Sequence, residues 1–188
     1  YEECLTYARQ AVNIDPLSAD HNAILAWILW NSGSYTESLA VLENIQEMHP
    51  LYPLGYAFAG AILATQGRAE AGVVMFEGAP ELARNDPMYK SFFAFTLGKA
   101  GKTEQAQELI DEILLLRKEN HFGTGYLCVA YLGLDDKKQA LRCAETAVKE
   151  IDAFFTYAGT LPVFSDLKDE PRFQQALATM DLSPVSDR

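Results

Sequence analysis

The stretch AFTLGKAGKTEQA, residues 94–106, contains the pattern that decides the fold. It has a short side chain, Ala94, seven places before Gly101, and a second short side chain, Ala106, five places after it. Apolar residues recur every three or four places on both sides of Gly101, which is the spacing of one face of an α-helix. The stretch therefore predicts two helices that meet at a tight turn.

The same arrangement recurs at a step of about 34 residues, a period typical of helix–turn–helix repeats. The turns fall at Gly33, Gly67, Gly101 and, one step later, at Asp135 beside Gly133. Two helix backbones can approach closely only where side chains are short, and a bulky residue there costs about 1–3 kcal/mol. The short residues before the turns are Ala26, Gly60, Ala94 and Cys128, and those after them, with Cys4 one step earlier, are Ser38, Gly72, Ala106 and Ala140.

This period, with its turn glycines and the closing prolines Pro16 and Pro50, resembles the tetratricopeptide repeat family over residues 1 to about 150. The resemblance implies an all-α fold, a right-handed α-solenoid of stacked antiparallel helix hairpins with a C-terminal capping helix. Since Tyr1 matches the aromatic residue that opens a second helix, we expect a truncated first repeat. The predicted division is a second helix at 1–17, repeats at about 18–52, 53–86, 87–119 and 120–150, and a closing part at 151–188.

Two parts of the chain depart from the repeat pattern. Gly78-Ala79-Pro80 falls inside an expected second helix, so we predict that this helix is broken or shortened. Residues 151–164 are aromatic and β-branched, with Gly159 and Pro162 as breakers, and predict an irregular segment. A final helix that starts near Pro171 and runs to about Met180 is predicted to cap the last repeat.

The sequence of residues 164–167 and 170–173 resembles the closing element of tetratricopeptide regions in bacterial signalling proteins and transcription regulators. This resemblance implies an effector or DNA-binding domain N-terminal to Tyr1. We therefore expect the chain to be part of a larger bacterial regulatory or signalling protein.

Composition excludes several classes of partner. The formal net charge of −11 argues against direct binding of nucleic acid and of an anionic membrane surface, since both need clustered Lys and Arg. No apolar run approaches the roughly 20 residues that span a bilayer, and the start lacks the basic and apolar blocks of a signal peptide. Three cysteines without Cys-x-x-Cys spacing indicate neither a disulfide framework nor a zinc site. We expect a protein of the reducing cytoplasm.

No catalytic or cofactor pattern is present in the sequence. The three histidines, His21, His49 and His121, show no metal-ligand spacing, so we predict no metal and no cofactor. Cys4 and Cys128 fall at short-residue core sites, where buried and unreactive thiols are expected. The chain is therefore predicted not to be an enzyme, although a catalytic site assembled on a helical scaffold stays a third hypothesis.

In the tetratricopeptide family the first helices of successive repeats line a concave groove. Lys99 and Asn31 alone could hold a carboxylate there and Asp20 would repel one, so the apolar groove favours an amphipathic helix, an extended apolar peptide or another copy of the chain. Trp27 and Trp30 lie three residues apart and fit either the groove or the core. The predicted groove residues are Asp20, Ala23, Trp27, Trp30, Asn31, Leu54, Ala57, Ala61, Met88, Ser91, Phe95, Lys99, Phe122 and Val129.

These observations predict a non-catalytic module that binds a peptide or protein segment in this groove. The alternative is self-association, in which the repeats form a homodimer and bind no foreign ligand.

Overall fold

The computed structural model describes residues 1–119 and 122–182, and its regular elements in these ranges are all helical. The helix α1 spans Glu2–Ile14 and precedes four helix pairs. The pairs are α2 (Ala19–Asn31) with α3 (Tyr35–Met48), α4 (Pro53–Thr65) with α5 (Ala69–Glu77), α7 (Pro87–Lys99) with α8 (Thr103–Glu119), and α9 (Gly125–Gly133) with α10 (Lys137–Lys149). The remaining elements are α6 (Glu81–Arg84), the 3₁₀ helices η1 (Phe154–Tyr157) and η2 (Pro162–Leu167), and α11 (Pro171–Thr179).

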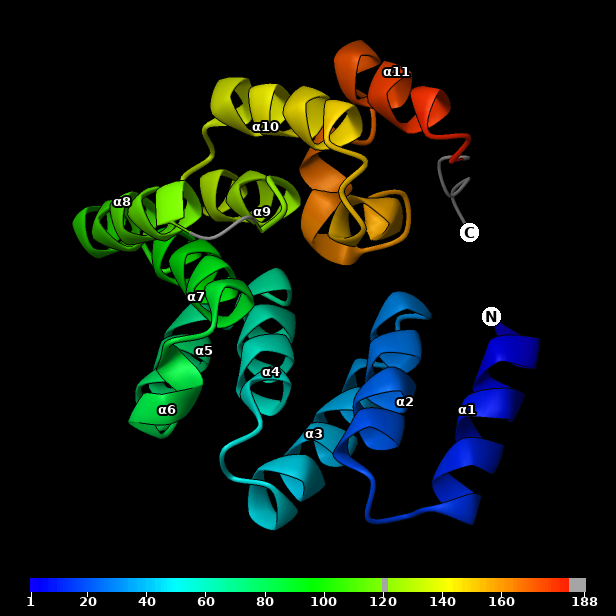
Figure 1. Cartoon of the computed structure of the whole chain (residues 1–188). Coiled ribbons are helices and arrows are strands. Elements are labelled where there is room, and N and C mark those ends of the chain that lie inside the picture. Colours follow the sequence, from blue (N-terminus) through cyan, green and yellow to red (C-terminus); the bar gives the residue numbers. More distant parts are fainter. Residues whose placement is uncertain (120–121, 183–188) are drawn as a thin grey trace.

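The helix pairs stack into a curved all-α solenoid, as the repeat predicts (Figure 1). Each first helix packs against its own second helix, and α2, α4 and α7 also pack against the first helix of the next pair, so that α2, α4, α7 and α9 form a continuous inner face. The C-terminal elements, drawn in orange and red, lie beside α9 and α10 (Figure 1).

The turns of the hairpins lie at the predicted residues. Gly33, Gly67 and Gly101 have φ angles of 81°, 74° and 77°, in the left-handed region that closes a helix and that glycine adopts without strain. Asp135 has a φ of 55° at the corresponding turn. Aspartate is among the few residues that tolerate this conformation.

The short residues mark the points where the helices of a hairpin cross. The Ser38 hydroxyl donates a hydrogen bond of 2.7 Å to the carbonyl of Ala26, across the α2–α3 crossing. At the α4–α5 crossing, a Cβ atom on Gly72 would lie only 2.7 Å from the carbonyl oxygen of Gly60, so the two backbones come too close for any side chain at this position. These crossings confirm the role predicted for short side chains.

Cys4 does not follow this rule, and the prediction that it is buried was wrong. Its side chain is exposed, whereas Ser38, Ala106 and Ala140, at the corresponding sites, are fully buried. The other sites are covered by the first helix of their own hairpin. Within residues 1–119 and 122–182, α1 has no such helix; it packs mainly on α2 through Ala8 and its neighbours, and Arg9 pairs with Glu37 of α3.

Both predicted departures from the repeat are confirmed. The helix α5 ends at Glu77, after nine residues, and the guanidinium of Arg84 donates a hydrogen bond of 2.8 Å to the carbonyl of Ala79. Past η2, α11 begins at Pro171 and packs on α10, where it covers the end of the solenoid.

Candidate partner-binding groove

The C-terminal segment, residues 151–167, folds back onto the inner face of the solenoid. Its start is fixed by Asp152, whose buried carboxylate accepts hydrogen bonds from the backbone N–H groups of Gly125 (2.6 Å) and Phe154 (2.9 Å). Gly125 is the first residue of α9, so the carboxylate also lies at the positive end of a helix dipole. A Cβ atom on Gly123 would lie 2.3 Å from the same carboxylate, which leaves room there for glycine alone.

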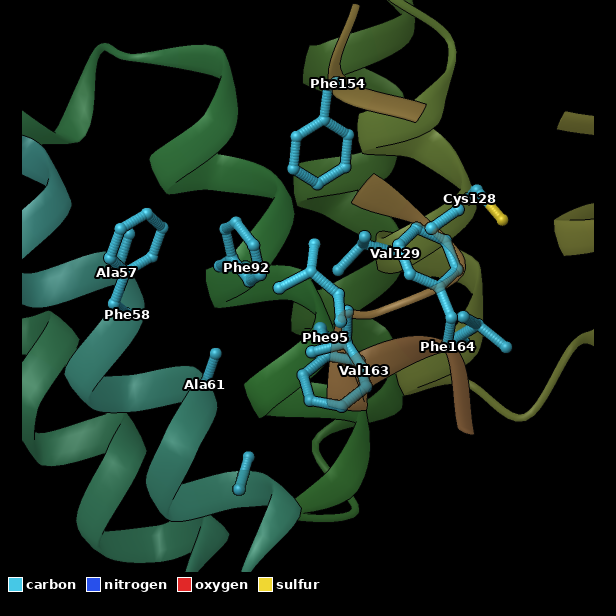
Figure 2. Close-up of a cluster of buried hydrophobic side chains, with 14 of the residues drawn as sticks. Ala57, Phe58, Ala61, Phe92, Phe95, Cys128, Val129, Phe154, Val163 and Phe164 are labelled. Atoms are coloured by element: carbon cyan, nitrogen blue, oxygen red, sulfur yellow. The ribbon is translucent and has the colours of Figure 1, made fainter. Parts of the chain in front are cut away.

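Aromatic side chains hold the C-terminal segment against the first helices. The ring of Phe154 stacks on Tyr126 of α9, with 4.4 Å between centroids, and meets Phe92 of α7 edge-on at 6.2 Å. Figure 2 shows Phe154, Val163 and Phe164 among the side chains that α7 and α9 direct inward. The segment therefore fills the part of the inner face formed by α7, α9 and the neighbouring side of α4.

This packing corrects part of the predicted groove. Trp30 is fully buried against Phe58 and Phe92, at centroid distances of 5.9 and 6.1 Å, and belongs to the core. The hydroxyl of Ser91 is directed at its own helix and donates to the carbonyl of Pro87. Because core packing and the C-terminal segment cover them, the predicted groove residues that face no open surface are Trp30, Ala57, Ala61, Ser91, Phe95 and Val129.

Lys99 and Phe122 also lie away from the open part of the inner face. The ammonium of Lys99 donates to Asp135 at 2.6 Å and to Asp166 of η2 at 3.2 Å. Burial lowers the pKa of Lys99, but its hydrogen bonds to the two carboxylates raise it above the ordinary value. Lys99 thus anchors the C-terminal segment instead of offering a cation to a ligand, and Phe122 borders a separate hollow beside Arg117 and Glu150.

An open hollow of 920 Å³ remains between α2 and the C-terminal segment, and we call it the α2 groove. One wall is α2 along most of its length, since its lining residues run from Asp20 to Asn31 at helical spacing, a rise of about 17 Å. The opposite wall is the C-terminal segment with Tyr157, and the floor is formed by α4 and α7. The lining residues are Tyr1, Cys4, Asp20, Ala23, Ile24, Trp27, Ile28, Asn31, Tyr52, Leu54, Phe58, Met88, Tyr126, Ala153, Phe154, Tyr157 and Thr160.

Trp27 is the centre of this hollow. Its indole is partly buried and touches Phe58 of the floor at a centroid distance of 4.9 Å and Tyr157 of the opposite wall at 5.2 Å. The structure therefore separates the two tryptophans, placing Trp27 on the groove and Trp30 beneath it. The predicted residues that line the α2 groove are Asp20, Ala23, Trp27, Asn31, Leu54 and Met88.

Sequence reasoning missed the wall contributed by the C-terminal segment. The sequence pattern places Phe154 and Tyr157 only in an irregular closing part. The aromatic content of residues 151–164 was the available signal, because aromatic side chains are usually buried and a solvent-exposed linker rarely contains several of them.

The polar chemistry of the α2 groove is concentrated at its rim. The exposed carboxylate of Asp20 accepts a hydrogen bond of 2.6 Å from the hydroxyl of Tyr52 through Oδ1. Burial, the hydrogen bond to Asp20 and the charge of Asp20 together raise the pKa of Tyr52, so this hydroxyl stays a donor at neutral pH.

The described part of the chain offers no other obvious chemistry. In residues 1–119 and 122–182, no three His, Cys, Asp or Glu side chains are grouped closely enough to hold a metal ion. Burial raises the pKa of the Cys128 thiol. Burial is also the main reason why the pKa of the Cys143 thiol is raised to about 12. Both thiols therefore stay protonated at neutral pH. No helix of these residues has the length and apolar character to cross a bilayer.

Comparison with known families agrees with the fold. A family model described as tetratricopeptide repeat matches residues 1–119, well over half of the chain. No curated protein matches the sequence. Repeats of this family are generally protein–protein interaction modules and typically serve as non-catalytic scaffolds. The chain belongs to the tetratricopeptide repeat family.

Proposed function

We propose that this chain is a non-catalytic module that binds a peptide or a segment of another protein in the α2 groove. The observation that carries the proposal is the groove itself, a 920 Å³ hollow with mostly apolar walls and an accessible tryptophan at its centre. Because its long wall runs for about 17 Å along α2, it suits an elongated segment of several residues.

Trp27 and Tyr157 are the expected anchors for such a partner. Aromatic side chains in the middle of an interface dominate binding energy, because each removes a large apolar area from water at small entropic cost. Trp27 comes from α2 and Tyr157 from the C-terminal segment, and their rings are in contact, so a segment that lies over this pair would contact both. An amphipathic helix and an extended apolar peptide both satisfy this chemistry.

Selection from a library of random peptides displayed on phage tests the proposal, because it does not require that the partner be identified first. A selected peptide, labelled with a fluorophore, is titrated with the wild type and with Trp27→Ala. Truncation of an aromatic anchor typically costs about 2 kcal/mol, so we expect roughly 30-fold weaker binding.

Tyr7→Ala is the matched control, because Tyr7 lies on α1 outside the groove and 62% of its surface is exposed. Circular dichroism of each variant checks that it is folded. The proposal is contradicted if selection yields no peptide, or if the selected peptides bind Trp27→Ala as tightly as the wild type.

Self-association is a second candidate function, supported by exposed apolar side chains near the N-terminus. Tyr7, Ile14 and Leu17 are 62%, 84% and 67% exposed, and Ile24, which lines the α2 groove, is 54% exposed. A second copy that covered these side chains would remove them from water. Sedimentation at micromolar concentration distinguishes the two functions, since a strict monomer eliminates the second.

The likeness of residues 164–173 to bacterial regulators supports a further proposal on context. We propose that the module acts in the cytoplasm as part of a larger bacterial regulatory or signalling protein. Sequencing of the complete gene tests this, and a product without an effector or DNA-binding domain would contradict it.

A further inference from the structure

We infer that the partner segment places a basic side chain, Lys or Arg, against Asp20 at the rim of the α2 groove. This inference rests on the proposed function, since it describes the occupant of the same groove. It specifies the partner as an apolar segment with one cation at the end of its apolar face.

The distribution of charge around the groove supports a cationic partner. Of the described side chains that line the α2 groove, that of Asp20 is the only charged one. In the described ranges, Asp20 forms no ion pair with a Lys, Arg or His side chain. Its carboxylate is therefore available at one end of an otherwise neutral apolar wall.

The geometry of Asp20 leaves it able to accept a further hydrogen bond. Oδ1 accepts from the hydroxyl of Tyr52, which fixes the orientation of the carboxylate. A carboxylate has two oxygens with about four acceptor sites, so Oδ2 can receive an ammonium or guanidinium donor. Because this carboxylate is exposed, such a contact resembles a surface ion pair and adds modestly to the affinity.

The same arrangement disfavours an acidic partner. Lys99, the one cation predicted for the groove, is held by Asp135 and Asp166 and does not line it. The net charge of −11 also attracts basic segments and repels acidic ones over a Debye length of about 8 Å at physiological salt. A carboxylate-bearing peptide would meet repulsion from Asp20 without a compensating cation in the groove.

The phage-displayed random peptide library tests the inference when it is selected in parallel on the wild type, Asp20→Asn and Asp20→Lys. Asn keeps an oxygen that accepts from Tyr52 but removes the charge. We expect Lys and Arg to be enriched in peptides from the wild type, this enrichment to disappear with Asp20→Asn, and Asp and Glu to be enriched with Asp20→Lys.

Titration of one selected peptide then locates the contact. Replacement of its basic residue by Gln should weaken binding to the wild type about fivefold and leave binding to Asp20→Asn unchanged. Asp111→Asn is the matched control, since it removes the same charge from an exposed site on the outer helix α8.

The outcomes separate this inference from the proposed function. Peptides that require Trp27 but show no preference for Lys or Arg would overturn the inference and leave the proposed function standing. A library that yields no groove-binding peptide overturns both. A basic preference that survives Asp20→Asn but is lost in Asp111→Asn places the cation elsewhere and also overturns the inference.

Discussion

Gly60 on α4 is a position where the repeat geometry predicts a large effect of a single methyl group. A Cβ atom there would lie 2.0 Å from Cε2 of Phe76, although ordinary contact begins at 3.4 Å. The Phe76 ring is fully buried, stacked on Phe93 at 4.8 Å and edge-on to Tyr89 at 5.0 Å, so it has little room to move. Gly60→Ala therefore forces overpacking of the core.

The two opposing effects of Gly60→Ala can be compared. Overpacking against a ring held on two sides belongs at the upper end of the usual range, about 3 kcal/mol. Replacement of glycine by alanine inside a helix stabilises the folded state by about 1 kcal/mol, because alanine has the higher helix propensity. We expect the free energy of unfolding, measured by urea titration with circular dichroism, to fall by about 2 kcal/mol.

The repeat itself suggests the variant that restores stability. One period earlier the same two sites hold Ala26 and Leu42, both buried. Adding Phe76→Leu to Gly60→Ala reproduces that pair, so the two substitutions should couple favourably by about 1 kcal/mol or more. Gly78→Ala, just past the end of α5, is the control for replacing glycine by alanine at an uncrowded site, because its φ of −73° suits alanine and its Cβ would meet only backbone oxygens at 3.4 and 3.6 Å. Overpacking is refuted if Gly60→Ala is as stable as the wild type, or if Phe76→Leu shows no coupling to it.

Three further predictions concern the thiols and the C-terminal segment. A maleimide at pH 7 should label Cys4 rapidly and Cys128 and Cys143 slowly in the native protein, as read by mass spectrometry, because only Cys4 is exposed. The free energy of unfolding should decrease as the pH rises from about 9 towards 12. Folding raises the pKa of Cys143 and of Tyr126 to about 12, so over this range the unfolded chain loses these protons first and is favoured. Cys143→Ala with Tyr126→Phe should make this decrease shallower in a denaturant series, and the raised pKa values of Cys128 and Tyr89 account for the part that remains. Ile151→Gly should raise the melting temperature and stabilise the protein by up to about 1 kcal/mol, since the exposed, β-branched Ile151 has a φ of 52° where glycine is preferred; an unchanged or lower value would contradict it.

The fold could be predicted from the sequence because its determinants are local. A left-handed turn at Gly33 and a close crossing at Ser38 depend on residues within one hairpin, and the period repeats them. The break after Glu77 follows in the same way from the Gly78-Ala79-Pro80 sequence. None of these features depends on contacts between distant parts of the chain.

The groove could be predicted only in part, because its second wall comes from far along the chain. Lys99 fits the groove pattern of α7, but Asp166, 67 residues later, reaches it from η2. Trp27 and Trp30 share a helical face, and only the packing of Phe58 and Phe92 on Trp30 decides which of them is buried. Periodicity assigns a residue to a face of its helix, whereas exposure depends on what the rest of the chain places against that face.

The C-terminal segment occupies the part of the inner face formed by α7 and α9 and, in our proposal, leaves the α2 groove for a partner. A crystal structure of the chain with a peptide selected from the library tests this most directly. We expect the peptide to lie along α2 in contact with Trp27 and Tyr157, with Phe154 and Phe164 still packed on α7 and α9. A peptide that takes the place of residues 154–164, or that binds the outer helices, would contradict the proposal.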